Sequence, residues 1–308
     1  MEPSTSSAPA QPADRVRRST LMAALRSLRP QQWVKNGFVF AALIFSRGLT
    51  DWNRSWTVAL AAMIFCLISS CVYLVNDILD APEDRHHPTK KLRPIASGRL
   101  SVEAAAIMAI LLGGVSLAAA WVLDPPFFLV VAVYAGINLL YSWFLKNVVL
   151  LDVFVVGAGF VLRVIGGGVV IHVEISPWLI VCTTLLALFI ALSKRRHELV
   201  LLRENASNHR SILAKYTPYF LDQLIAVVTA STVVSYALYT LSPDVHSKFP
   251  GKHLEFTIPF VLFGIFRYLY LVHQNEGGGN PTRLLFTDPV LLSVVLMWAA
   301  SVVFIIYL

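Results

Sequence analysis

The chain has 308 residues, of which 56% are apolar and only 14% are charged, and its net charge is +7. Its mean hydropathy is +0.67. A soluble domain carries about a quarter charged residues, so these values exclude a water-soluble globule and predict an integral membrane protein.

The N-terminal segment differs in composition from the rest of the chain. Residues 1–13 are rich in Ser, Pro and Ala, and the basic run Arg15 to Arg18 follows. We predict a disordered basic tail over residues 1–30 and a single transmembrane domain over residues 31–308. The short apolar run at 21–28 contains an arginine, so no signal-peptide cleavage is expected.

Nine apolar stretches approach the length that crosses a bilayer, which is about 20 residues. The first has the shortest apolar core, between Lys35 and Arg47. The stretches cover about 34–49, 55–79, 102–123, 126–145, 148–170, 176–194, 219–241, 255–273 and 288–307. They predict an all-α, polytopic bundle of nine helices, with the two termini on opposite faces because nine is odd.

The basic residues gather on one predicted face. The N-terminal segment and the second, fourth, sixth and eighth connections hold 19 of the 25 Lys and Arg residues. Lys and Arg favour the cytoplasmic side of a membrane. We therefore expect a cell-membrane protein whose N-terminus is cytoplasmic and whose C-terminus is outside. Attraction to anionic lipid would also explain a basic face, but it would not explain the carboxylates found there.

Three of those carboxylates follow the second predicted span. On a continued helix, Asp77, Asp80 and Asp84 share a stripe about 60° wide. Like charges repel, and a hard divalent cation is the usual way to neutralise them. Pro82 is expected to kink or end the helix, so that Asp84 would reach the ion from a loop.

A solvated loop is the alternative interpretation of this stripe, with the acids paired to Arg85 or Lys90. Carboxylates at a membrane face that have cations beside them are functional by default. We therefore interpret the segment as a receptor for a pyrophosphate group, built from a metal ion and cations.

The carboxylates form the motif Asn76-Asp77-x-x-Asp80-x-x-x-Asp84. Three further stretches are distinctive: Arg29-Pro30-Gln-Gln32-Trp33-Val34-Lys35-Asn36, His87-Pro88-x-Lys90-x-x-Arg93-Pro94-Ile95-Ala96-x-Gly98, and Tyr141-Ser142-x-x-Leu145-Lys146. The first motif resembles the first aspartate-rich motif of the UbiA-type intramembrane prenyltransferase superfamily, and the three stretches resemble its decaprenyl-phosphate phosphoribosyltransferase branch. The likeness covers essentially the whole chain.

The resemblance implies a nine-helix fold with a cytoplasm-facing pocket. It also implies an enzyme that transfers 5-phosphoribosyl from phosphoribosyl pyrophosphate (PRPP) to decaprenyl phosphate, for arabinan cell-wall precursors. Mg²⁺ would be held by Asp77, Asp80 and Asp84, which are the expected catalytic residues. The expected substrate-binding residues are Lys35, Asn36, Asn76, Arg85, Lys90, Arg93, Tyr141, Lys146, Asp152, Lys194, Arg195 and Glu198.

The second aspartate-rich motif of typical aromatic prenyltransferases is missing. The corresponding stretch here is Lys194 to Glu198, with no DxxD or DxxxD pattern beyond it. One acidic and one cationic cluster suit a donor with more phosphate charge, and the resemblance supplies PRPP as that donor. A phosphate monoester is already an anion near neutral pH, so the acceptor needs no general base.

Several of these residues have simpler explanations. Lys35 could be a snorkelling lysine at a helix end, and Lys146, Lys194 and Arg195 could be positive-inside anchors. Glu198 lies one helical turn after Lys194, which suits an ion pair between them.

Span five carries two unusual charges, Asp152 and Arg163. They share a face but lie about 16 Å apart along the helix, too far to pair. Both should face the bundle interior, with Asp152 near the pocket and Arg163 deep and structural. We expect Gly166–Gly168 to permit close helix packing rather than to bind phosphate.

Two other functions stay open. A prenyltransferase of the same fold would move a polyprenyl group from its diphosphate to an aromatic acceptor. A transporter is disfavoured, because the central spans lack matched broken helices and the acids lie at one face. The expected partners are the bilayer, PRPP and a polyprenyl phosphate, with no nucleic acid, and a homo-oligomer is left open.

Overall fold

In the computed structural model of the protein, residues 12–87, 89–203, 215–274 and 281–308 are described. This part of the chain is helical and contains no strand. The α-helices are α1 (Pro12–Ser27), α2 (Ala41–Phe45), α3 (Trp52–Asp84), α4 (Val102–Leu123), α5 (Pro125–Trp143), α6 (Leu151–Val169), α7 (Pro177–Arg203), α8 (Pro218–Leu241), α9 (Pro243–Lys248), α10 (Ile258–Gln274), α11 (Pro281–Thr287) and α12 (Pro289–Tyr307). Short 3-10 helices are η1 (Pro30–Phe40), η2 (Lys90–Leu92), η3 (Leu145–Asn147) and η5 (Leu254–Thr257).

Eight helices of the described part are long and apolar enough to cross a membrane. They are α3 to α8, the continuous η5 and α10, and α12. The predicted multi-pass, all-α bundle is thus confirmed. The first predicted stretch, 34–49, is not among the eight, because it forms η1 and the five-residue α2 instead of one long helix.

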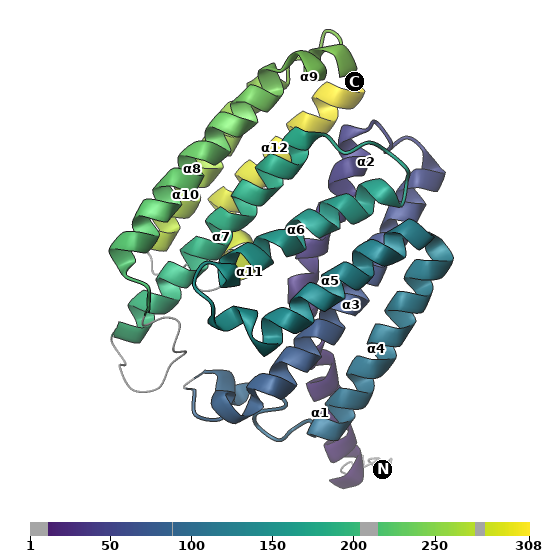
Figure 1. The fold of residues 1–308 in the computed structure, drawn as a ribbon, viewed down its shortest axis with the longest axis vertical. Coiled ribbons are helices and arrows are strands. Elements are labelled where there is room, and N and C mark those ends of the chain that lie inside the picture. The colour runs from purple at the N-terminus through teal and green to yellow at the C-terminus, as the bar shows by residue number, and fades with distance from the viewer. Residues whose placement is uncertain (1–11, 88, 204–214, 275–280) are drawn as a thin grey trace, which may run out of the picture.

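Consecutive long helices pack side by side from α3 to α8, and α10 packs against both α8 and α12. Figure 1 shows the long helices running roughly along one another, with α1 at one end and the C-terminus beside α9 at the other. The two termini of the described chain therefore lie at opposite ends of the bundle (Figure 1), as expected from the nine predicted stretches, the first of which forms η1 and α2.

Capping residues and prolines set where the helices begin. Six helices of the described part start at a side chain that accepts a hydrogen bond from a backbone N–H of the first turn, which satisfies a donor that has no partner within the helix. These caps are Asp51 on α3, Ser101 on α4, Asp124 on α5, Thr217 on α8, Ser242 on α9 and Asp288 on α12. Proline is the first residue of α5, α8 and α12, where its missing N–H costs nothing.

Small residues bring η1 against α6. A Cβ built on Gly167 would lie 1.9 Å from the Val39 carbonyl oxygen, and one on Gly166 would lie 2.7 Å from the Phe65 ring. Only glycine permits this approach, so the predicted close packing at Gly166–Gly168 is confirmed. Val39 and Leu43 are fully buried there, and the segment carrying Lys35 is thereby held inside the bundle.

Two local predictions are corrected. Helix α3 continues through Pro82 and ends at Asp84, so Asp84 projects from the helix and not from a loop. Helix α1 occupies residues 12–27, within the tail predicted to be disordered, and Ala23 and Ser27 are buried. Residues 1–11 lie outside the described part, and the division into a tail and one domain stays a prediction.

Candidate active site

The three predicted carboxylates are buried at one end of α3. The exposed fractions of Asp77, Asp80 and Asp84 are 3%, 5% and 3%. Because the helix continues through Pro82, the spacing of three and four residues keeps all three on one face. Buried charges are costly unless they are paired, so their neighbours decide what this end of the helix can do.

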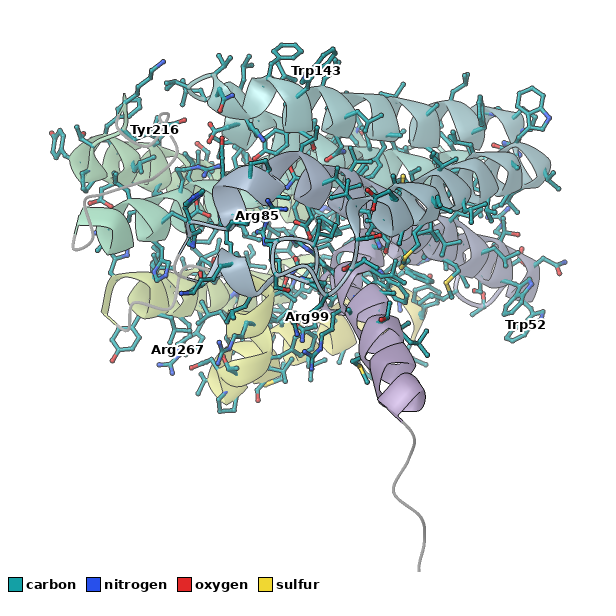
Figure 2. All side chains as sticks on the ribbon, turned by 90° about the horizontal axis from the view of Figure 1, so that it is seen from below. Trp52, Arg85, Arg99, Trp143, Tyr216 and Arg267 are labelled. Atoms are coloured by element: carbon teal, nitrogen blue, oxygen red, sulfur yellow. The ribbon has the colours of Figure 1, made fainter. Side chains whose placement is uncertain are left out.

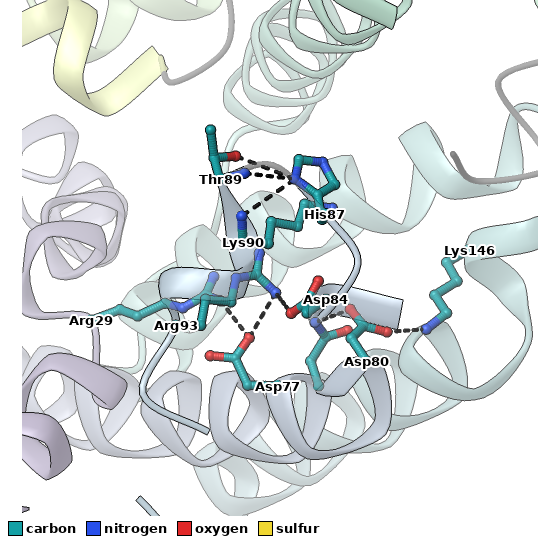
Figure 3. A network of polar contacts seen from close by, with 10 residues as sticks. Arg29, Asp77, Asp80, Asp84, His87, Thr89, Lys90, Arg93 and Lys146 are labelled. Carbon is teal, nitrogen blue, oxygen red and sulfur yellow. Dashed lines mark hydrogen bonds and ion pairs between the residues drawn. The ribbon is translucent and has the colours of Figure 1, made fainter. Parts of the chain in front are cut away.

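Cations from three separate segments contact the carboxylates (Figure 3). Arg29 Nη2 lies 2.5 Å from Asp77 Oδ1, and Arg93 Nη1 lies 3.0 Å from the same oxygen. Arg93 Nη1 also lies 2.6 Å from Asp84 Oδ2. Each of these carboxylates therefore has at least one guanidinium partner.

Asp80 has partners of its own. Lys146 Nζ, from η3, lies 2.5 Å from Asp80 Oδ1, and Asn76 Nδ2 donates to Asp80 Oδ2 at 2.8 Å. Asn76 lies one turn earlier on α3. The structure therefore brings Asn76, Arg93 and Lys146 to the carboxylates; all three are among the residues expected to bind substrate, and that role stays a prediction.

The loop after α3 folds back so that Arg93 can reach the carboxylates. His87 Nδ1 accepts hydrogen bonds from the backbone N–H groups of Thr89 and Lys90, which starts η2. Gly98 closes the following turn at a φ of 74°, a left-handed conformation that favours glycine. The loop is thus an ordered scaffold that carries Arg93.

A second polar cluster lies where α6 begins and α7 ends. Asp152 is fully buried, and its Oδ2 lies 2.8 Å from Arg195 Nη2. Arg195 Nη1 lies 2.5 Å from Glu198 Oε2, and Tyr141 also hydrogen-bonds with Arg195. Three predicted substrate-binding residues therefore contact the guanidinium of a fourth, Arg195.

Tyr216 joins this cluster, although no motif or spacing in the sequence selects it. Its hydroxyl donates to Asp152 Oδ1 at 2.8 Å and accepts from the Leu150 N–H at 2.7 Å. Burial raises the pKa of Tyr216 to about 12, so the phenol keeps the proton that it donates. It lies just before α8, beyond the part of the chain that carries any recognised motif.

Lys35 lies between the two clusters. Its ammonium is in the electrostatic field of Arg29, Arg163 and Lys194, and in the described part of the chain it forms no ion pair. Lys194 lies 3.7 Å from Glu198 Oε1, the pair that the i,i+4 spacing suggested. Around Lys35, therefore, the neighbouring charged side chains are mostly positive, and Glu198 contacts Lys194 only at 3.7 Å.

Arg163 of α6 is hydrogen-bonded to η1. Its Nε donates to Asn36 Oδ1 at 2.7 Å, and its Nη2 donates to the Tyr134 hydroxyl at 2.9 Å. Its Nη1 donates to the Gly159 carbonyl at 2.6 Å. All three acceptors are neutral. As predicted, Arg163 is buried and does not pair with Asp152, and it holds Asn36, the neighbour of Lys35.

Arg85 and Lys90 are the remaining predicted residues. Arg85 is exposed, with no ion pair in the residues that the structure describes, and Figure 2 shows it with Arg99 on the face seen from below. Lys90 belongs to η2 in the loop above (Figure 3). Arg29 contacts Asp77 but was not among the predicted substrate-binding residues, although it is the first residue of the stretch Arg29 to Asn36. It lies between α1 and η1, in a left-handed conformation with a φ of 53°.

The three carboxylates alone do not form a complete set of protein ligands for a divalent ion. No group of three or more His, Cys, Asp and Glu side chains that could hold a metal occurs among the described residues. Mg²⁺ commonly takes one or two carboxylates and completes its shell with water and substrate phosphate. Asp77 and Asp80, one turn apart on α3, supply the two carboxylates that such a shell uses.

The chain is similar to known proteins over most of its length. It is 34% identical to a decaprenyl-phosphate phosphoribosyltransferase of Corynebacterium glutamicum, over 92% of this chain and 86% of that one. It is 35% identical to the protein of the same name from Mycobacterium tuberculosis H37Rv, over 90% and 92%.

Its fold is also known. A solved UbiA homologue from Archaeoglobus fulgidus, bound to GPP and Mg²⁺, superposes with a TM-score of 0.68 at 18% identity, over 93% of this chain and 100% of that one. The model of the UbiA prenyltransferase family matches residues 37–277. The buried aspartates of α3 and the cations around them thus belong to a member of the UbiA prenyltransferase family.

Proposed function

We propose that this protein is a magnesium-dependent phosphoribosyltransferase that moves 5-phosphoribosyl from PRPP to decaprenyl phosphate and releases pyrophosphate. The relatives named decaprenyl-phosphate phosphoribosyltransferase support this activity, because they align with about nine-tenths of the chain at 34% and 35% identity.

One observation carries the choice of donor. Where a second aspartate-rich motif would hold another metal, this chain has Lys194 and Arg195 at the end of α7, with Lys35 beside them. The acids of that cluster, Asp152 and Glu198, are already engaged by Arg195. A site with surplus positive charge suits PRPP, whose 5-phosphate must be bound in addition to its pyrophosphate.

The reaction forms a bond between an oxygen of the lipid phosphate and the anomeric carbon of ribose, and it breaks the bond from that carbon to pyrophosphate. The attacking phosphate is already an anion, so no side chain needs to remove a proton. In-line displacement inverts the anomeric centre. The protein's task is therefore to orient the two substrates and to neutralise the departing charge.

We assign these tasks to separate groups. Asp77 and Asp80, with Asp84, would hold Mg²⁺, which when bound stabilises the charge that develops on the leaving oxygen. Arg29 and Arg93 would turn from the carboxylates to the pyrophosphate, as guanidinium groups bind phosphate oxygens bidentately.

Lys35 and Lys194 would bind the 5-phosphate. Neither has a short ion pair to break, since the Lys194 contact is 3.7 Å long and Lys35 has none in the described residues. The exposed Arg85 would attract PRPP to the pocket without touching the reacting atoms.

We also propose that the end of the bundle with the carboxylates faces the cytoplasm in the cell membrane. The distribution of Lys and Arg supports this orientation, and PRPP is a soluble, highly charged donor that must reach the site from water.

The test uses purified protein in detergent with Mg²⁺, labelled PRPP and decaprenyl phosphate. We expect labelled lipid to form, and removal of Mg²⁺ with a chelator to abolish its formation. A parallel reaction supplies a polyprenyl diphosphate and an aromatic acceptor. Transfer in that reaction, with no labelled lipid from PRPP, would replace the proposal with a prenyltransferase.

Site residues are tested with a matched pair of lysines. Lys35→Gln should lower kcat/KM for PRPP by about a hundredfold, as expected for the loss of a charge-assisted contact worth about 3 kcal/mol. Lys91 is exposed in the same basic face, so Lys91→Gln should retain wild-type kinetics. Equal kinetics for the two variants would remove Lys35 from the donor site.

A further inference from the structure

A cavity of about 210 Å³ lies at the end of the bundle opposite the carboxylates. It is enclosed by α2, the connection from α6 to α7, the end of α8, and α9, which lies beside the C-terminus in Figure 1. Helix α7 begins to span the membrane at Pro177. The cavity is therefore at the level of the lipid headgroups on the face away from the catalytic site.

Aromatic rings form one wall of the cavity. Phe45, Trp178 and Tyr239 line it, and the rings of Phe45 and Tyr239 meet edge to face at 5.9 Å. Tyr239 is only 8% exposed, and within the described residues its hydroxyl has no hydrogen-bond partner. A buried phenol normally has one, and the neighbouring Tyr236 bonds to Thr257. The Tyr239 hydroxyl is thus available to a ligand.

Charges of both signs surround the opening. Glu174 and Asp244 line the cavity together with Lys248, and in the described part of the chain none of the three forms an ion pair. The first turn of α7, from Pro177, lines it too. In that turn Pro177 has no N–H, and the N–H groups of Leu179 and Ile180 already donate to the Ser176 carbonyl, so Lys248 is the group that would bind an anion. The cavity thus has groups for a cation and a group for an anion.

We propose that this cavity binds the headgroup of an aminophospholipid such as phosphatidylethanolamine. The primary ammonium would lie between the carboxylates of Glu174 and Asp244 and the Tyr239 hydroxyl. The phosphate would lie against Lys248, with the acyl chains in the surrounding bilayer.

The acceptor atoms favour a primary ammonium over choline. Two carboxylates and a hydroxyl can accept hydrogen bonds from its three N–H groups, whereas a trimethylammonium group donates none. An anionic headgroup without an amine would meet the two carboxylates and be repelled. Selectivity should therefore follow the amine and not the phosphate.

Native mass spectrometry of the full-length protein in detergent tests the proposal. Phosphatidylethanolamine, phosphatidylcholine and phosphatidylglycerol with identical acyl chains are supplied in equal amounts. We expect phosphatidylethanolamine adducts to exceed each of the others by about tenfold, the equivalent of one additional charge-assisted hydrogen bond. Equal adducts of the three lipids would overturn the proposal.

Variants separate the two ends of the headgroup. Glu174→Gln combined with Asp244→Asn should erase the preference for phosphatidylethanolamine over phosphatidylcholine. Lys248→Gln should weaken both lipids by the same factor and keep their ratio. Lys252→Gln is the control, because Lys252 lies on the same face outside the cavity. Persistence of the preference in the double variant would refute the ammonium site.

A soluble headgroup distinguishes a lipid from a free amine. Glycerophosphoethanolamine has the same charges without acyl chains, so we expect it to displace the lipid only at far higher concentration. Binding as tight as that of the lipid would make a soluble amine the ligand and overturn the lipid assignment. Transfer from PRPP should be unchanged in all of these variants.

Discussion

The contact between Asp80 and Lys146 allows a structural role to be separated from a catalytic one. The two side chains are 7% and 13% exposed, and their charged atoms lie 2.5 Å apart. Removing one partner of a buried ion pair leaves an uncompensated charge, which costs about 3–5 kcal/mol. Because the lysine keeps some contact with solvent, we expect Asp80→Asn to lower the free energy of unfolding by about 3 kcal/mol, the lower end of that range.

The second substitution should reverse most of this loss. Replacing a buried ion pair by apolar groups of similar volume is often neutral, so Asp80→Asn combined with Lys146→Met should lie within about 1 kcal/mol of the wild type. The coupling energy between the two sites should therefore be about 2 kcal/mol or more. Unfolding is followed by tryptophan fluorescence in one detergent, and transfer from PRPP is measured on the same samples.

Activity should not follow stability in this cycle. The double variant should be as stable as the wild type, because neither charge of the pair remains. It should be inactive, because it still lacks a proposed metal ligand. A coupling energy near zero would show that the pair contributes nothing to folding. Recovered turnover in the double variant would show that Asp80 acts only by neutralising Lys146, and would remove it from the metal site.

Three further substitutions test the packing around the site. Gly167→Ala should destabilise the protein by about 1–3 kcal/mol or more, as overpacking does, because its Cβ would meet the Val39 carbonyl; Gly136→Ala, which meets no atom within 4 Å, is the control, and equal melting temperatures would contradict the close approach. Arg163→Lys should be less stable than Arg163→Met, because lysine keeps the buried charge but loses most of the hydrogen bonds; thermal unfolding in the reverse order would refute this. Tyr216→Phe leaves a buried carboxylate oxygen with one partner fewer and should cost about 1–3 kcal/mol, whereas unchanged chemical denaturation would show that the phenol is dispensable.

The sequence determined the properties that depend on local pattern. Apolar runs of bilayer length predict spans because the membrane core fixes the length of a helix. The spacing of Asp77, Asp80 and Asp84 predicts one shared face because the helical period is fixed. Gly166–Gly168 predicts a close contact because only glycine lacks a Cβ. These predictions agree with the structure except at the first apolar stretch, 34–49, which is not one of the eight spanning helices of the described chain.

Local rules were insufficient where the environment outweighed a single residue. Pro82 was expected to kink or end the helix, but a proline removes only one backbone hydrogen bond, and the buried face of α3 continues to Asp84. The first predicted span has only a short apolar core between Lys35 and Arg47, and the chain there adopts η1 and α2 instead of one long helix. Tertiary packing decided both cases.

Partners distant in sequence came only from the tertiary structure. Periodicity shows which face of a helix is buried, but not which residue of another helix lies opposite. Lys146 reaches Asp80 across 66 residues, and Tyr216 reaches Asp152 across 64. Arg163 meets Asn36 across 127. The sequence thus determined that this is a membrane protein with an acidic stripe beside cations, whereas the packing of its helices decided which cation neutralises each acid.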